Sequence, residues 1–166
     1  MSDIRGRRSV RKYTGEEVTE EQVVELLKGA MSAPSAANQQ PWRFVVIRSQ
    51  EQRDRIPAFH PHASMAPSAS VVIAVCGDLS ELRIAERWVQ DCSAATQNLL
   101  LAAHDMGLGA VWLGVYPTED RVEGVRRLLG LPEHIMPLAM VAIGHPAEHP
   151  PAADRFEPGY VHYDRW

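Results

Sequence analysis

Apolar side chains recur at helical spacing in two parts of the chain. Thr19 and Gln22 have the spacing of a capping box, and apolar residues follow them on one helical face, which predicts a helix over residues 20–31. A longer pattern over residues 81–106 carries a wide apolar face. A helix of that length would span about 37 Å. Because this exceeds one side of a domain of this size, we expect the helix to reach a second subunit.

Short runs of β-branched and other apolar residues predict a sheet between these helices. The run over residues 71–77 barely alternates, so both of its faces should be covered and its strand should be central. Further helices are predicted over residues 50–56 and, after Thr118 as N-cap, over 119–130. The predicted strands cover residues 42–48, 71–77, 110–115 and 135–144. This alternation of helices and strands indicates a layered α/β or α+β fold.

Length and composition indicate one globular domain over residues 1–166. The chain has 45% hydrophobic and 23% charged residues, and it holds no apolar run of membrane-spanning length. No apolar stretch follows the cations near its start, so we expect a cytoplasmic protein without a membrane partner. A net charge of −4 argues against general affinity for nucleic acid. Cys76 and Cys92 form no paired motif and are expected to be buried, inert thiols.

A cluster of cations at the start of the chain contrasts with this acidic balance. Arg7, Ser9 and Arg11 share one face if the segment is extended, and the two arginines share a face if it is helical. Guanidinium groups match phosphate oxygens, so a phosphate monoester is a natural ligand. The alternative is a solvated basic segment that binds nothing. The cations of the cluster are Arg5, Arg7, Arg8, Arg11 and Lys12.

Two further segments have the features of ligand contacts. The stretch MSAPSAANQQPW (residues 31–42) is built of small side chains and amides, and Asn38 can pair with an imide edge. An ordinary linker is the alternative. Gly114 lies inside a predicted strand, which indicates either close approach of a ligand or a bulge. His60 and His62 lack a third metal-ligating residue at useful spacing, so a solvated loop without metal is favoured for them.

Four motifs in this order resemble the FMN-dependent nitroreductase family, especially its short members. They are RRSVRKY near the start, SAPSAANQQPWRFVV, DCSAATQNLLLAAHDMGLGAVWLG in the second half and DRFEPGYVHYDRW at the end. The resemblance covers nearly the whole chain. It implies an α+β fold with a mixed, mainly antiparallel sheet flanked by helices, in an intertwined homodimer with an exchanged C-terminal tail.

The resemblance also assigns residues that would bind FMN. Arg11 would lie near N1 and O2 of the flavin ring, where a fixed cation favours reduction because reduced flavin holds negative charge there. The phosphate and ribityl chain would be met by Arg7, Arg8, Ser9 and Arg155. A loop from the second subunit would supply Pro34, Ser35, Ala36 and Asn38, and a strand would direct the backbone N–H groups of Trp112, Leu113 and Gly114 at flavin N5.

The chain departs from the family pattern at three places. Leu113 stands where many relatives have an acidic residue, and Ala153 stands where some have a second phosphate-binding cation. Larger members read the pyrimidine edge of the flavin with an Asn and a Lys before the central strand. Here Ser64 or a histidine would have to take that role.

The activity that the resemblance implies is ping-pong transfer of electrons from NADH or NADPH, through FMN, to a nitroaromatic, a quinone or a similar small electrophile. No side chain need act as an obligatory acid or base, because the cofactor performs the redox step. One alternative within the same fold is reductive dehalogenation or oxygen-dependent breakdown of the flavin. The others are a flavin-binding protein without turnover and, more remotely, a metal-dependent hydrolase that uses the histidines.

Overall fold

The computed structural model describes the backbone of residues 2–166 and the side chains from residue 4 onward. Four strands form one sheet in the order β1-β2-β4-β3, and each neighbouring pair is antiparallel. Within the described residues, parallel pairing is confined to an isolated bridge between Ser9 and Ala110, so the predicted mixed sheet is antiparallel in its four strands. The strands are β1 (Trp42–Ile47), β2 (Val71–Asp78), β3 (Gly109–Gly114) and β4 (Ile135–Gly144).

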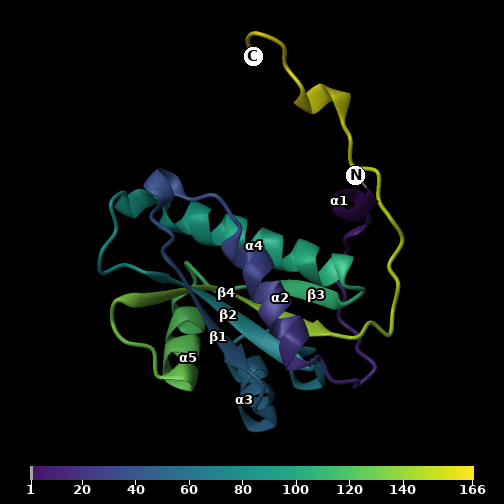
Figure 1. The fold of residues 1–166 in the computed structure, drawn as a ribbon, viewed down its shortest axis with the longest axis vertical. Helices are drawn as coiled ribbons and strands as arrows, with labels where there is room; N and C mark the ends of the chain where they lie inside the picture. Colours follow the sequence, from purple (N-terminus) through teal and green to yellow (C-terminus); the bar gives the residue numbers. More distant parts are fainter. Residues whose placement is uncertain (1) are drawn as a thin grey trace.

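Helices cover both faces of the sheet (Figure 1). On one face, α2 (Glu20–Met31) packs on α4 (Trp88–Asp105), and a Cβ atom added at Gly29 would lie 2.8 Å from Cβ of Ala102. Glycine therefore allows the two helices to approach closely. The other face is covered by α5 (Glu119–Leu129) and by residues 56–69, which follow α3 (Gln50–Arg55). A short helix, α1 (Ser2–Gly6), lies against α4.

Most predicted elements are present close to their expected bounds. The capping box of Thr19 and Gln22 is formed at the start of α2, as predicted. Residues 71–77 are buried on both faces in a central strand, also as predicted. Thr118 occupies the N-cap position of α5, but its side chain makes no capping hydrogen bond.

The expected start of the long helix at residue 81 is wrong. The helix α4 begins at Trp88 and has 18 residues, so it is about 27 Å long. A short 3₁₀ turn, η4 (Ala85–Arg87), comes directly before it, and Ile84 at the start of this turn has a non-helical backbone whose N–H donates to the side chain of Gln39 at 3.0 Å. That contact with a distant loop takes the place of a helical turn, and no periodicity along residues 81–87 could indicate it.

The C-terminal tail leaves the body of the chain. Every residue from 151 to 166 is exposed, and Figure 1 shows this yellow segment running away from the sheet and helices. Its aromatic side chains are almost fully accessible, at 85% for Tyr160 and 99% for Trp166. The described residues of its own chain therefore leave these aromatic side chains uncovered. Among the helices described, none is both long and apolar enough to cross a membrane.

Candidate functional site

Arg7 and Arg155 come from opposite ends of the chain, yet the fold brings them near enough for the positive charge of Arg155 to act on Arg7. Arg7 follows α1 and is half-buried. Burial lowers its pKa below the usual value, and the neighbouring guanidiniums of Arg8 and Arg155 lower it further. Like charges that gather at a half-buried position repel one another, and a bound anion would relieve this repulsion. The arrangement thus forms a candidate site for a phosphate group.

Arg8 is engaged in holding the C-terminal segment. Its Nε donates to the carbonyl oxygen of Pro151 at 2.9 Å, and its Nη2 donates to that of Ala153 at 3.4 Å. These bonds fasten the chain just before Arg155. The resemblance assigns Arg8 to the phosphate and ribityl chain, which stays a prediction; in this structure its guanidinium donates to main-chain carbonyls of the tail.

The N-terminal segment is extended beside β3, which fits the first of the two predicted arrangements of Arg7, Ser9 and Arg11. Ser9 forms the bridge to Ala110, and the N–H of Val10 donates to the carbonyl of Ala110 at 3.0 Å. The described N-terminal segment pairs with β3 near Ala110, and beyond this residue β3 is an edge strand of the sheet. Arg7 and Arg11 line different pockets rather than one.

The free edge of β3 directs backbone donors away from the sheet. Because the carbonyl of Ala110 faces outward, the two-residue period of a strand turns the N–H groups of Trp112 and Gly114 outward as well. The backbone of Leu113 faces β4 instead, opposite Met140. Of the three residues predicted to offer N–H groups, two therefore present them at the open edge.

This edge lines a pocket of ≈ 460 Å³. Arg11 also lines it, so the structure brings together the predicted cation and the predicted strand. A Cβ atom built on Gly114 meets no atom of the described chain within 4 Å, so glycine is not required there by packing. The remaining lining residues are His60, Pro61, His62, Ser64, Met65, Val111 and Arg121.

Two residues that sequence reasoning missed hold the end of β3. The carbonyl oxygen of Gly114 accepts hydrogen bonds from His60 Nε2 at 2.8 Å and from Arg121 Nη1 at 2.9 Å. The acceptor is a carbonyl, so Nε2 of His60 carries the proton. Burial lowers the pKa of His60, which is therefore a neutral donor at pH 7.

The prediction of a solvated loop is wrong for His60, which is 1% exposed, although His62 is exposed. No pattern along the sequence indicates this burial, because the partner of His60 is Gly114, far away in the chain. Among the described side chains, no group of three His, Cys, Asp or Glu could hold a metal ion. Cys76 and Cys92 are free and buried as predicted, and burial raises the pKa of each thiol to about 12.

The loop before β1 has an unusual backbone. It contains a short turn over Ala36–Asn38, and three non-glycine residues have positive φ: Ala37 at 49°, Asn38 at 51° and Gln40 at 47°. Such conformations are sparsely populated and cluster at functional sites. Pro34 and Asn38 are exposed, and none of the loop residues lines the pocket beside β3 of the same chain. Within one chain, the structure keeps this predicted loop apart from Arg11 and Gly114.

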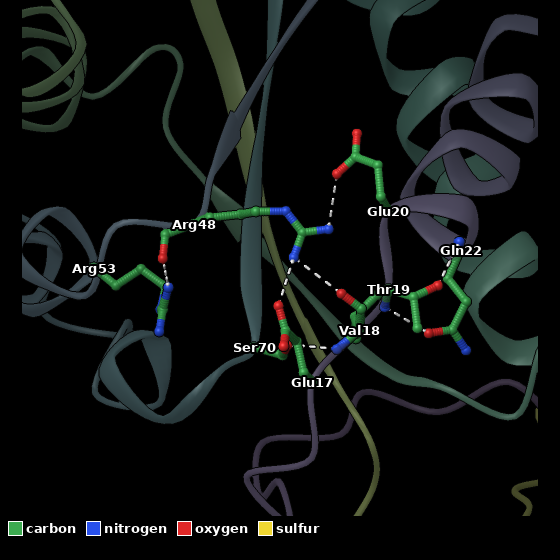
Figure 2. A network of polar contacts seen from close by, with 8 residues as sticks. All are labelled: Glu17, Val18, Thr19, Glu20, Gln22, Arg48, Arg53 and Ser70. Carbon is green, nitrogen blue, oxygen red and sulfur yellow. Dashed lines mark hydrogen bonds and ion pairs between the residues drawn. The ribbon is translucent and has the colours of Figure 1, made fainter.

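A second polar network lies apart from this site, around the start of α2 (Figure 2). Arg48 donates to the carbonyl of Val18 at 2.9 Å and pairs with Glu20 at 3.2 Å and Glu17 at 3.7 Å. Ser70 accepts the N–H of Val18 at 2.7 Å. These bonds hold the chain before α2 against the end of β1 and the start of β2, so the network stabilises the fold.

Comparisons with known proteins agree with these features. A sequence model described as the nitroreductase family matches residues 4–67 and 60–145. A protein of Methanothermobacter thermautotrophicus, provisionally named NADH dehydrogenase/NAD(P)H nitroreductase, is 51% identical over 166 residues, which cover 100% of this chain and 87% of that protein.

Solved structures are similar over nearly the whole chain. A protein of Parabacteroides distasonis with the same provisional name has 41% identity and a TM-score of 0.95, with 99% of this chain and 97% of that chain covered. A nitroreductase of Desulfovibrio desulfuricans, so named provisionally and solved in complex with FMN, has 34% identity and a TM-score of 0.85, with 99% and 96% covered.

Proposed function

Because this chain belongs to the nitroreductase family, we propose that it is an FMN-dependent oxidoreductase that takes electrons from NAD(P)H. The observation that carries the proposal is a pair of neighbouring features. Arg7, on which the charge of Arg155 acts, lines a pocket with Ala110 near one end of β3, and Arg11 lines the pocket at the open N–H edge near the other end. A molecule with a phosphate at one end and a polar flat ring at the other matches this donor set.

FMN fits the residues that are present. The guanidiniums of Arg7 and Arg155 would hold its phosphate, since guanidinium groups match phosphate oxygens and the charge of one already acts on the other. Ser9, which lies between Arg7 and Arg11 along the chain, would face the ribityl chain. The N–H groups of Trp112 and Gly114 would face the ring, and the two donors on the carbonyl of Gly114 keep this strand end in place.

When bound, FMN supplies the redox chemistry, accepting a hydride from NAD(P)H at N5 and passing electrons to a nitroaromatic, a quinone or a similar electrophile in ping-pong order. The chain itself provides binding, orientation and charge. Arg11 would place a positive charge near the pyrimidine side of the ring, where it stabilises the added negative charge.

We further propose that the active form is a homodimer. In the strained loop of Pro34, Ser35, Ala36 and Asn38, the first and last of these residues are exposed and none of the four lines the pocket of its own chain, so the loop would complete the site of a second copy. The tail over residues 151–166 would dock on that copy, because its aromatic side chains lack cover on their own chain. These two features support an exchange of segments between subunits.

The visible spectrum of the purified protein tests the proposed function directly. We expect a yellow protein, or a colourless one that becomes yellow with added FMN, whose absorbance bleaches under anaerobic NADH or NADPH and returns with a nitroaromatic or a quinone. A monomeric protein that binds no FMN would refute the proposal. A protein that binds FMN but is not bleached by either nucleotide would refute the catalytic part alone.

Arg11→Ala should make the flavin harder to reduce. Arg11 is exposed, so solvent screens its charge, and we expect the two-electron midpoint potential to fall by roughly 20–40 mV. Redox titration against a reference dye measures it, with Lys12→Ala as the control for loss of a neighbouring cation. An unchanged potential in Arg11→Ala would remove this role.

Gly114→Ala should separate flavin binding from folding. The added methyl group meets no atom of the described chain within 4 Å, so the apoprotein should be as stable as the wild type or slightly more so. The same methyl group would occupy space beside the ring, and we expect the FMN dissociation constant to rise about 10-fold. FMN fluorescence quenching and the Tm of the apoprotein measure the two effects. Unchanged FMN affinity would show that the ring does not approach Gly114.

A further inference from the structure

The loop before β1 holds a conformation that its own residues disfavour. Ala37, Asn38 and Gln40 all have φ between 47° and 51°. L-residues rarely adopt this region because Cβ crowds the following carbonyl, and alanine has no side-chain hydrogen bond to offset the cost. Such a backbone persists only when its surroundings stabilise it.

A buried carboxylate on α4 holds this loop. Asp91 lies in the first turn of α4 and is 5% exposed. Its Oδ1 accepts the backbone N–H of Ala36 at 2.9 Å, and its Oδ2 accepts Nε2–H of Gln39 at 2.7 Å. Both oxygens of the carboxylate thus bind residues on either side of Ala37. Hydrogen bonds to a charged, buried acceptor are stronger than those between neutral groups.

Gln39 has one possible orientation in this arrangement. Its Oε1 accepts the N–H of Ile84 at 3.0 Å, while its Nε2 donates to the carbonyl of Ile84 at 3.1 Å as well as to Asp91. Rotating the amide by half a turn would place donor against donor and acceptor against acceptor. Asp91 and the segment before α4 therefore hold the loop from its inner side.

Two further hydrogen bonds hold the outer side of the loop. The hydroxyl of Ser35 accepts the N–H of Gln40 at 3.1 Å, and Oδ1 of Asn38 accepts Nε2–H of Gln40 at 3.2 Å. These bonds fix the exposed rim, and Asn38 itself is exposed. The loop is therefore held from its inner side by Asp91, while its rim at Asn38 is exposed.

We propose that Asp91 is a positioning residue that holds residues 35–40 in the shape needed to close over the flavin of a second copy. The proposal rests on the proposed function for its consequence, flavin affinity. The structural part of the proposal, that Asp91 holds the loop, does not depend on FMN. Asp91 would act through Ala36 and Gln39 and need not touch the flavin.

Asp91→Asn tests the hold with the smallest change in size. The new Oδ1 can still accept from Ala36, but its NH₂ then faces the NH₂ of Gln39, and neither amide can rotate without losing another partner. We expect backbone amides of residues 35–40 in the apoprotein to exchange hydrogen at least about 10-fold faster. We expect the FMN dissociation constant to rise about 10-fold or more. Asp105→Asn, at the exposed end of the same helix, is the matched control and should change neither quantity.

A second substitution separates positioning from general stability. Ala37→Gly removes the steric cost of the left-handed conformation, so in the Asp91→Asn background it should restore at least about a third of the lost FMN affinity. In the wild type it should change affinity less than about 2-fold. Gln39→Ala, which breaks the same contact without altering α4, serves if Asp91→Asn does not fold, and the same loop exchange and loss of affinity are expected from it.

The outcomes distinguish the two proposals. Unchanged exchange and affinity in both Asp91→Asn and Gln39→Ala would overturn the positioning role, as would lost affinity that Ala37→Gly does not restore. A wild-type protein that binds no FMN would overturn the proposed function, while faster loop exchange in Asp91→Asn would still support the hold on the loop.

Discussion

Arg7→Ala should weaken FMN binding about 100-fold without destabilising the apoprotein. A hydrogen bond to a charged group contributes roughly 1.5–3 kcal/mol, and loss of about 2.7 kcal/mol corresponds to that factor. Burial lowers the pKa of Arg7, and the positive charges of Arg8 and Arg155 lower it further. Removal of Arg7 relieves repulsion in the apoprotein, so the Tm should stay the same or rise slightly. Titration of apoprotein with FMN and a thermal melt measure the two effects.

Riboflavin provides the control, because it has the same ring without the phosphate. Its weaker binding should be the same in Arg7→Ala and in the wild type. Arg127→Ala, which removes an exposed arginine from α5, should leave FMN binding unchanged. Equal losses for FMN and riboflavin in Arg7→Ala would show that Arg7 supports the ring or the fold and not the phosphate.

Truncation after Ala153 should convert the protein to a folded monomer with poor flavin binding. The removed residues are all exposed and include Phe156, Tyr160, Tyr163 and Trp166, so the core does not depend on them. The bonds from Arg8 to Pro151 and Ala153 are kept. If the four aromatic side chains are buried against a second copy, their loss should raise the dimer dissociation constant at least about 100-fold.

Sedimentation velocity from nanomolar to micromolar concentration measures this change, and far-UV circular dichroism reports whether the truncated chain is folded. Truncation also removes Arg155, so Arg155→Ala in the full-length chain is the matched control. It should remain dimeric while it loses FMN affinity. A truncated chain that dimerises as tightly as the wild type would contradict the docking of the tail.

Regular elements could be predicted because their rules act over a few residues. The helix over Glu20–Met31 follows from its capping box and apolar face, and the central position of β2 follows from its unbroken apolar run. The start of α4 could not be predicted in this way. Residues 81–87 were expected to be its first turns, but Ile84 binds Gln39, which lies far away in the chain, and α4 begins at Trp88.

The residues of the candidate site also fall into those that the sequence could identify and those that it could not. Arg7, Arg11, Gly114 and the small-residue loop could be selected from residue types and from the family resemblance. The sequence had no means of finding Asp91, His60 or Arg121, because each acts on a main-chain group of another element. It also could not show that Arg8 binds the tail, or that Arg155 comes near enough for its charge to act on Arg7.

The sequence by itself determined which residue types are present that could bind an anion or a flat ring of a redox cofactor. Guanidiniums, amides and glycine have the same chemistry wherever they lie. The sequence also determined most helices and strands, since capping and periodicity are local. Only the tertiary structure decided which of these groups meet and which backbone donors are free. Those are properties of long-range packing, where a carbonyl or an N–H is directed by the partner that the fold brings to it.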